Sequence, residues 1–162
     1  MNDKLSYLDH AATTYPRQPQ VMDQMLLRFK EVGCSPSRGG YDLAVEAEAK
    51  VKTIRQRLAN FFGAVDPDRV VFTSNATEAL NMAIFGLSRP GGHCVATRLE
   101  HNSVLRPLYH LEQNKQMTYS LVGFNKEGFI DPGDIADAIQ KNTCLVVINH
   151  ASNVLGSVQP VD

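Results

Sequence analysis

The sequence predicts an α/β fold with a largely parallel sheet, because strand-like and helix-like segments alternate along its second half. Short apolar runs typical of strands lie near residues 69–73, 93–97, 117–122 and 144–149. Segments with helical spacing lie between them, near 77–87, 103–113 and 133–140. Turn sequences at Gly91–Gly92 and at Asp131–Pro132–Gly133 punctuate the pattern. Alternation of this kind is typical of parallel strands joined by helices that cover the sheet.

The first 62 residues have a different pattern and are expected to form a separate part of the molecule. They begin with a short arm rich in small residues, which Pro16 and Pro19 interrupt. Apolar residues at helical spacing predict helices near 20–32 and 43–62, with a loop rich in glycine and serine between them. We therefore divide the chain into an N-terminal arm with helices over 1–62 and a ligand-binding domain over 63–162.

Composition excludes several classes of function. The chain has 162 residues, 43% of them apolar, which suits a globular domain with a buried core. Its net charge of −1 offers no general attraction to nucleic acid or to an anionic membrane surface. The apolar runs are strand-sized, which argues against a signal peptide or a membrane span and makes a cytoplasmic location the default expectation. The three cysteines, Cys34, Cys94 and Cys144, are far apart and lack the spacing of a metal site, so we expect no metal and no disulfide.

Three polar clusters follow three of the expected strands. They are Ser74–Glu78, Glu100–Ser103 and His150–Asn153. In parallel α/β sheets ligands bind at the carboxyl ends of the strands, so these clusters are expected to share one crevice. The first cluster also opens a helix, where unpaired backbone N–H groups and the helix dipole favour an anion such as a phosphate ester.

These stretches, taken together, resemble a known family. The matching segments are Tyr7–Thr14, Phe72–Asn81, Glu100–Ser103 and His150–Gly156, in family order and spread over nearly the whole chain. In them the chain is similar to the N-terminal part of cysteine desulfurases, which are pyridoxal 5'-phosphate (PLP) enzymes of the class V aminotransferase family. The resemblance implies part of a fold-type I large domain, with a mostly parallel sheet flanked by helices, preceded by an arm and helices that belong to the small domain and the interface.

The resemblance also assigns roles to particular residues. It implies that Asn75, Ala76 and Thr77 hold the cofactor phosphate, through backbone N–H groups and the threonine hydroxyl. His101 matches the imidazole that stacks on the pyridine ring and transfers protons, which makes it the one catalytic candidate. Asn153 matches an amide near the phenolic oxygen of the cofactor and the substrate carboxylate. From the sequence alone, Asn75 or Thr77 could instead cap the helix, and Ser152–Asn153 could be an ordinary turn.

Several family residues have no counterpart in the chain. None of its lysines follows the small-residue-then-His-Lys pattern of the Schiff-base lysine, and none of its cysteines matches the nucleophilic one. The chain is therefore expected to be a truncated piece that is inactive alone and, because its sheet of about four strands lacks neighbours, marginally stable or prone to associate.

The activity implied for the complete enzyme is conversion of L-cysteine to L-alanine, with transfer of sulfur to an enzyme cysteine persulfide and then to an acceptor protein, as in sulfur metabolism and iron–sulfur cluster assembly. The resemblance implies a homodimer. A sister activity, such as a selenocysteine lyase or an aminotransferase for a small amino acid, stays open. So does a non-catalytic module that binds a phosphorylated ligand.

Overall fold

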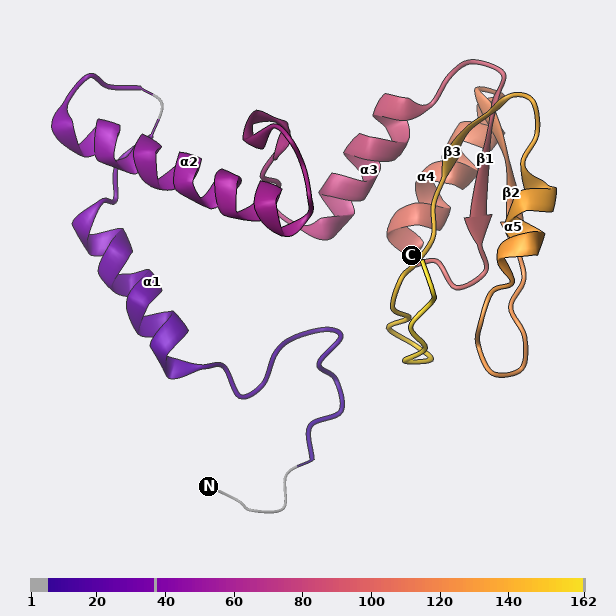
Figure 1. Cartoon of the computed structure of the whole chain (residues 1–162), viewed down its shortest axis with the longest axis horizontal. Coiled ribbons are helices and arrows are strands. Elements are labelled where there is room, and N and C mark those ends of the chain that lie inside the picture. Colours follow the sequence, from indigo (N-terminus) through magenta and orange to yellow (C-terminus); the bar gives the residue numbers. More distant parts are fainter. Residues whose placement is uncertain (1–5, 37, 162) are drawn as a thin grey trace. The chain divides into compact units, whose positions relative to one another are not determined.

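The computed structural model describes residues 6–36 and 38–161, and its contacts divide the chain into two compact units. The first unit runs to Val71 and the second begins at Phe72. The sequence analysis placed the boundary between residues 62 and 63 and assigned the two parts to a small and a large domain. Both assignments stay predictions. Figure 1 shows the elements in chain order.

The first unit is helical. Helix α1 spans Pro19–Glu31 and helix α2 spans Asp42–Phe61, followed by the short 3-10 helix η1 at Pro67–Arg69. Helix α2 buries the small side chains of Ala44, Ala47 and Ala59. Two ion pairs one turn apart lie along the helix, between Glu46 and the half-buried Lys50 and between the exposed Glu48 and Lys52. An exposed pair such as Glu48–Lys52 adds only tenths of a kcal/mol, roughly 0.3–0.5.

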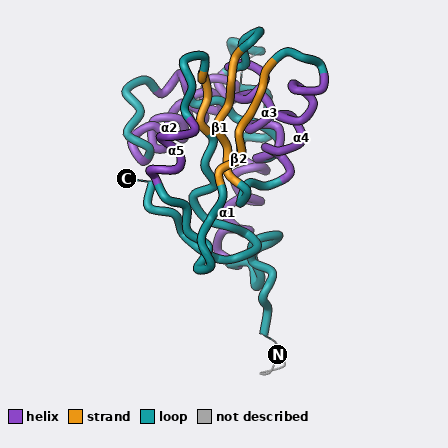
Figure 2. Tube along the Cα trace, turned by 90° about the vertical axis from the view of Figure 1, so that its right-hand side faces the viewer, coloured by secondary structure: helices purple, strands orange, loops and turns teal. Residues whose placement is uncertain are grey.

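The second unit contains a parallel sheet with helices on both faces (Figure 2). Its strands are β1 at Gly92–Thr97, β2 at Met117–Val122 and β3 at Thr143–Val146, in the order β2-β1-β3. The helices are α3 at Ala76–Leu87, α4 at Asn102–Gln113 and α5 at Pro132–Ala138. Strand β1 is buried along its whole length because it lies between two strands and between two helical layers. The predicted α/β class and parallel sheet are confirmed.

The core lies on both faces of β1. On one face Cys94 and Ala96 pack with Ile84 of α3 and with Leu108 and Leu111 of α4. On the other face Val95 packs with Val122 and Ile130, and Ile135 and Ala138 of α5 lie against this cluster. The alternation along β1 follows from the two-residue period of a strand, which sends successive side chains to opposite faces.

The sequence prediction of a strand near 69–73 is wrong. The first residue of the predicted run, Arg69, is the last residue of η1. The rest of the run, from Val70 to Thr73, is not part of the sheet. A strand is stable only when it pairs with another strand by hydrogen bonds. Among the described residues, β2 and β3 are the edge strands of the sheet, and this run pairs with neither of them. Val71 remains 63% exposed. The sheet therefore has three strands, not the four expected.

A buried histidine fastens the three strands at the start of β1. His93 is 1% exposed, and its Nδ1 lies 2.8 Å from Thr143 Oγ1 of β3. Its Nε2 lies 3.0 Å from Ser120 Oγ of β2. Burial lowers the pKa of His93 below its ordinary value. The neutral His93 ring thus has a structural role, because it links β1 to β2 and β3. The sequence analysis did not identify this residue.

Helix length and polarity also bear on membrane insertion. Within the described part of the chain, no helix is both long and apolar enough to cross a bilayer.

Candidate functional site

Helix α3 begins with a closed set of capping hydrogen bonds. Asn75 precedes its first residue, and the Asn75 Oδ1 atom accepts a hydrogen bond from the backbone N–H of Glu78 at 2.9 Å. The Glu78 carboxylate accepts one from the backbone N–H of Ser74 at 2.8 Å, and this bond lowers the pKa of Glu78. Within the described residues, no acceptor bonds to the backbone N–H groups of Ala76 and Thr77. These two donors stay available at the positive end of the helix dipole.

His101 stands at the start of helix α4, where it acts as the N-cap. Its Nδ1 accepts a hydrogen bond from the backbone N–H of Ser103 at 3.1 Å, and the Ser103 hydroxyl lies 2.8 Å from the same atom. An Nδ1 atom that accepts a backbone N–H bond carries no proton, so the neutral ring has its proton on Nε2. The capping contact therefore fixes both the orientation of the ring and its tautomer.

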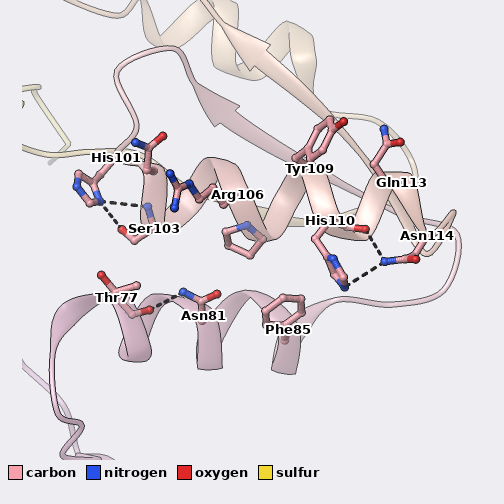
Figure 3. Close-up of a pocket in the computed structure, with 12 residues that line it drawn as sticks. Thr77, Asn81, Phe85, His101, Ser103, Arg106, Tyr109, His110, Gln113 and Asn114 are labelled. Carbon is pink, nitrogen blue, oxygen red and sulfur yellow. Dashed lines mark hydrogen bonds between the residues drawn. The ribbon is translucent and has the colours of Figure 1, made fainter.

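A groove of about 760 Å³ lies between α3 and α4, and Thr77 and His101 line the same end of it (Figure 3). The two helices run in the same direction, because Phe85 and His110 meet at the other end with their ring centroids 6.1 Å apart. The N-termini of both helices, with their positive dipole ends, are thus neighbours. Other residues that line this α3–α4 groove include Asn81, Ser103, Arg106, Tyr109 and Asn114.

Asn153 lies in a second hollow, of about 370 Å³, which His101 also lines. The loop that carries Asn153 is held by its neighbours. The buried Ser152 accepts hydrogen bonds on Oγ from the backbone N–H groups of Val154 and Leu155, at 3.3 and 3.1 Å. The side chain of Gln159, 3% exposed, fastens the same segment to the loop before α5 through Gly128 O and the backbone N–H of Ile130. Asn153 itself is exposed on a fixed loop.

The structure brings the predicted residues together in part. His101 is common to both hollows, with Thr77 in one and Asn153 in the other. Asn75 and Ala76 are not among the described residues that line either hollow. The Asn75 side chain is used as a helix cap, and Ala76 offers its backbone N–H at the start of α3. The roles assigned to these residues stay predictions.

Glu100 is a residue of this region to which the sequence assigned no role. Its Oε1 accepts hydrogen bonds from Thr97 Oγ1 and from the backbone N–H of Asn149, both at 2.7 Å. Burial raises the pKa of the Glu100 carboxyl, and these hydrogen bonds oppose that rise. The position of Glu100 directly before His101 is the one sequence signal that could have indicated a role for it. Its partner Asn149 is distant in the sequence and could not be inferred.

Two observations on the described residues concern chemistry outside the hollows, namely the burial of Cys94 and the absence of a metal-binding cluster. Cys94 is fully buried, and burial raises the pKa of its thiol to about 12, so it remains protonated and inert. No group of three or more histidine, cysteine, aspartate or glutamate side chains among residues 6–36 and 38–161 could hold a metal ion.

Comparisons with known proteins agree on one family. The family described as "Aminotransferase class-V" matches residues 6–162. A protein of Dictyoglomus turgidum named "Cysteine desulfurase IscS" is 38% identical over 160 residues, which is 96% of this chain and 39% of that protein. A "Probable cysteine desulfurase" of Methanothermobacter thermautotrophicus is also 38% identical, over 96% of this chain and 38% of its own length. This chain thus spans about two fifths of the relatives it matches.

Solved structures show the same likeness in three dimensions. The structure described as "SspA in complex with cysteine" aligns with a TM-score of 0.86 and 32% identity, over 96% of this chain and 45% of that one. The "Apo structure of Cysteine Desulfurase from Thermococcus onnurineus NA1" aligns with a TM-score of 0.74 and 29% identity, over 86% of this chain and 36% of that one. The fold is therefore part of the fold-type I architecture expected from the sequence.

Proposed function

Because this chain belongs to the aminotransferase class-V family, we propose that it is part of a PLP-dependent cysteine desulfurase and supplies the phosphate-binding and ring-binding half of the cofactor site. The names of the matched relatives support the choice of desulfurase. A matched structure that holds cysteine supports L-cysteine as the substrate. The observation that carries the proposal is the position of His101, which lines one hollow with Thr77 and another with Asn153.

The donors present fit the chemistry of PLP. A phosphate dianion requires several N–H or O–H donors, and the backbone N–H groups of Ala76 and Thr77, with the Thr77 hydroxyl, supply them at a helix N-terminus. A flat pyridine ring can stack on the His101 imidazole, whose plane is set by Ser103. The Asn153 amide can donate to the phenolic oxygen without adding charge. Asn75 contributes indirectly, because its cap holds the first turn of α3 in place.

We propose that His101 also transfers a proton. The neutral ring presents Nε2–H, so Nδ1 is its basic atom and takes up a proton when the Ser103 N–H bond opens; the resulting imidazolium can donate a proton from Nε2. PLP, when bound, supplies an electron sink that stabilises negative charge at the α-carbon of an amino acid. The proposed overall reaction turns L-cysteine into L-alanine and leaves the sulfur on an enzyme cysteine as a persulfide, from which an acceptor protein takes it.

The residues for the covalent and sulfur-transfer steps are not recognised in this chain, so we propose that the 162 residues alone are inactive. A homodimeric complete enzyme, a role in iron–sulfur cluster assembly and a cytoplasmic location are proposals that rest on the same family likeness. The alternatives are a sister activity of the family, such as a selenocysteine lyase or an aminotransferase for a small amino acid.

Ligand binding to the purified chain tests this proposal. PLP should bind more tightly than pyridoxal, which lacks the phosphate, and more tightly than inorganic phosphate, which lacks the ring. Borohydride treatment followed by peptide mass spectrometry should find no single lysine that carries the cofactor. Equal affinity for PLP and inorganic phosphate would instead support a module for phosphate esters, and a cofactor reduced onto one specific lysine would contradict the assignment of the missing lysine.

A further inference from the structure

A network of hydrogen bonds joins the loop that carries His101 to the segment that leads to Asn153. Glu100 Oε1 accepts from Thr97 Oγ1 and from the backbone N–H of Asn149, each at 2.7 Å. In return, Asn149 Nδ2 donates to the backbone oxygen of Leu99 at 2.9 Å. We call these four residues the Glu100 junction. It connects two segments that lie 49 positions apart in the sequence.

Two residues of the junction are buried and two, Glu100 and Asn149, are half-buried, and its donors are committed. Thr97 is 0% exposed and Leu99 is 9% exposed. The Thr97 hydroxyl accepts from the backbone N–H of Leu99 at 3.2 Å, so its single proton is directed at Glu100. The buried Thr97 and Leu99 limit competition from water on their side of the junction. The junction therefore holds the end of β1 and the segment after β3 at a fixed separation.

That separation matters for the candidate site. His101 directly follows Glu100, and Asn153 follows Asn149 by one short loop. Glu100, His101 and Asn153 line the same hollow of about 370 Å³. We propose that Glu100 is a positioning residue, whose carboxylate sets the distance between His101 and Asn153 and so shapes the site for a ring-bearing phosphate ester. This inference rests on the proposed function.

Variants of Glu100 can distinguish the effect of its side-chain length from the effect of its charge. Both donors bond to the same oxygen, Oε1, so an amide oxygen at the same reach can replace it. Glu100→Gln should therefore keep the junction. Glu100→Asp keeps the charge but is shorter by one methylene group, so it should lose the contact with Asn149. Glu100→Ala removes the acceptor altogether. A proton-transfer role for Glu100 would predict the opposite ranking of the glutamine and aspartate variants.

Amide hydrogen exchange, followed by NMR on the chain without ligand, reads the junction directly. The Asn149 amide should exchange at least about tenfold faster in Glu100→Ala and Glu100→Asp than in the parent, because its hydrogen bond is lost. In Glu100→Gln it should stay within about threefold of the parent, because an amide oxygen at the same reach still accepts the hydrogen bond. The Val147 amide, which donates to Val95 O at 2.9 Å between the same two segments, is the internal reference and should keep its protection.

Affinity for pyridoxine 5'-phosphate, which has no aldehyde and cannot react with lysines, then tests the positioning role. The dissociation constant should rise about tenfold in Glu100→Ala and Glu100→Asp and stay within about threefold in Glu100→Gln. Glu127→Ala, a change at an exposed glutamate of the loop before α5, is the matched control and should bind like the parent.

Each outcome decides the inference. Parent-like affinity in Glu100→Asp, or a protected Asn149 amide in Glu100→Ala, overturns it. Loss of Asn149 protection or of folding in Glu100→Gln also overturns it, because a retained acceptor would then be insufficient. A parent chain that does not bind pyridoxine 5'-phosphate overturns the proposed function instead, and the exchange of Asn149 still reports on the junction.

Discussion

Replacement of His93 by leucine is predicted to destabilise the fold and to remove part of its pH dependence. The His93 ring is 1% exposed and bridges Thr143 of β3 and Ser120 of β2. Gln140 Nε2 also approaches His93 Nε2, at 3.4 Å. This arrangement suits a neutral ring with its proton on Nδ1, because Nε2 then accepts from the serine hydroxyl and the glutamine amide.

The size of the effect follows from these contacts. His93→Leu removes two hydrogen bonds, each with a net value of about 1 kcal/mol. Thr143 Oγ1 keeps a partner, since it accepts from the backbone N–H of Gln140 at 2.7 Å. The Ser120 hydroxyl loses the ring as its acceptor. We therefore expect a loss of about 2 kcal/mol in the free energy of unfolding at mildly alkaline pH.

The sign of the pH effect is set by the lowered pKa of the buried ring. Below the ordinary histidine value of 6.5, the unfolded chain binds a proton that the folded ring does not bind. The parent therefore loses stability as the pH falls from 6.5 toward the lower pKa of the folded state, by up to about 1.4 kcal/mol per pH unit. His93→Leu lacks this loss, so the difference in stability between parent and variant should shrink as the pH falls.

Urea unfolding followed by far-UV circular dichroism, at several pH values between about 5 and 8, measures this difference. Leu87→Ala, at a 55% exposed position without a titratable group, is the control and should leave the pH dependence of the parent unchanged. A difference between the parent and His93→Leu that stays constant over this range would refute the assignment of a buried neutral ring.

Three further predictions concern the fold. Leu108→Ala should lower the free energy of unfolding by about 2–5 kcal/mol in urea denaturation, because Leu108 is 0% exposed in the core under α4, whereas Leu87→Ala at a 55% exposed position should change it by less than about 1. Asn75→Ala should cost about 1 kcal/mol through loss of the α3 cap, and a variant as stable as the parent would contradict the capping role. Sedimentation velocity should show concentration-dependent association of the chain, because Met25, Leu26 and Phe29 of α1 are 59, 52 and 72% exposed and Val71 is 63% exposed; a clean monomer with a cooperative melt would count against this expectation.

Much of the fold could be predicted from the sequence because its signals are local. The apolar run at 93–97 and the helical spacing of 103–113 lie within one residue of β1 and α4 in the structure. Asn75 precedes an apolar helix, which is the ordinary sequence signal of an N-cap. The run near 69–73 was wrongly assigned because its composition suits a strand, while strand formation depends on a partner that local sequence does not specify.

The parts that sequence reasoning missed depend on long-range pairing. The partners of His93 in the other strands lie 27 and 50 positions away, and Glu100 meets Asn149 49 positions away. Nothing in either local sequence indicates these partners. His101 was recognised as a candidate from its family motif, but its fixed tautomer depends on Ser103 N–H, which is a matter of geometry.

Chemical-shift mapping with pyridoxine 5'-phosphate tests the central claim, that Thr77, His101 and Asn153 touch one small molecule. The backbone amide signals of these three residues should shift together on titration and fit a single dissociation constant, and inorganic phosphate should move only the signals at the start of α3. Shifts confined to Thr77, or separate dissociation constants for His101 and Asn153, would contradict a shared cofactor site.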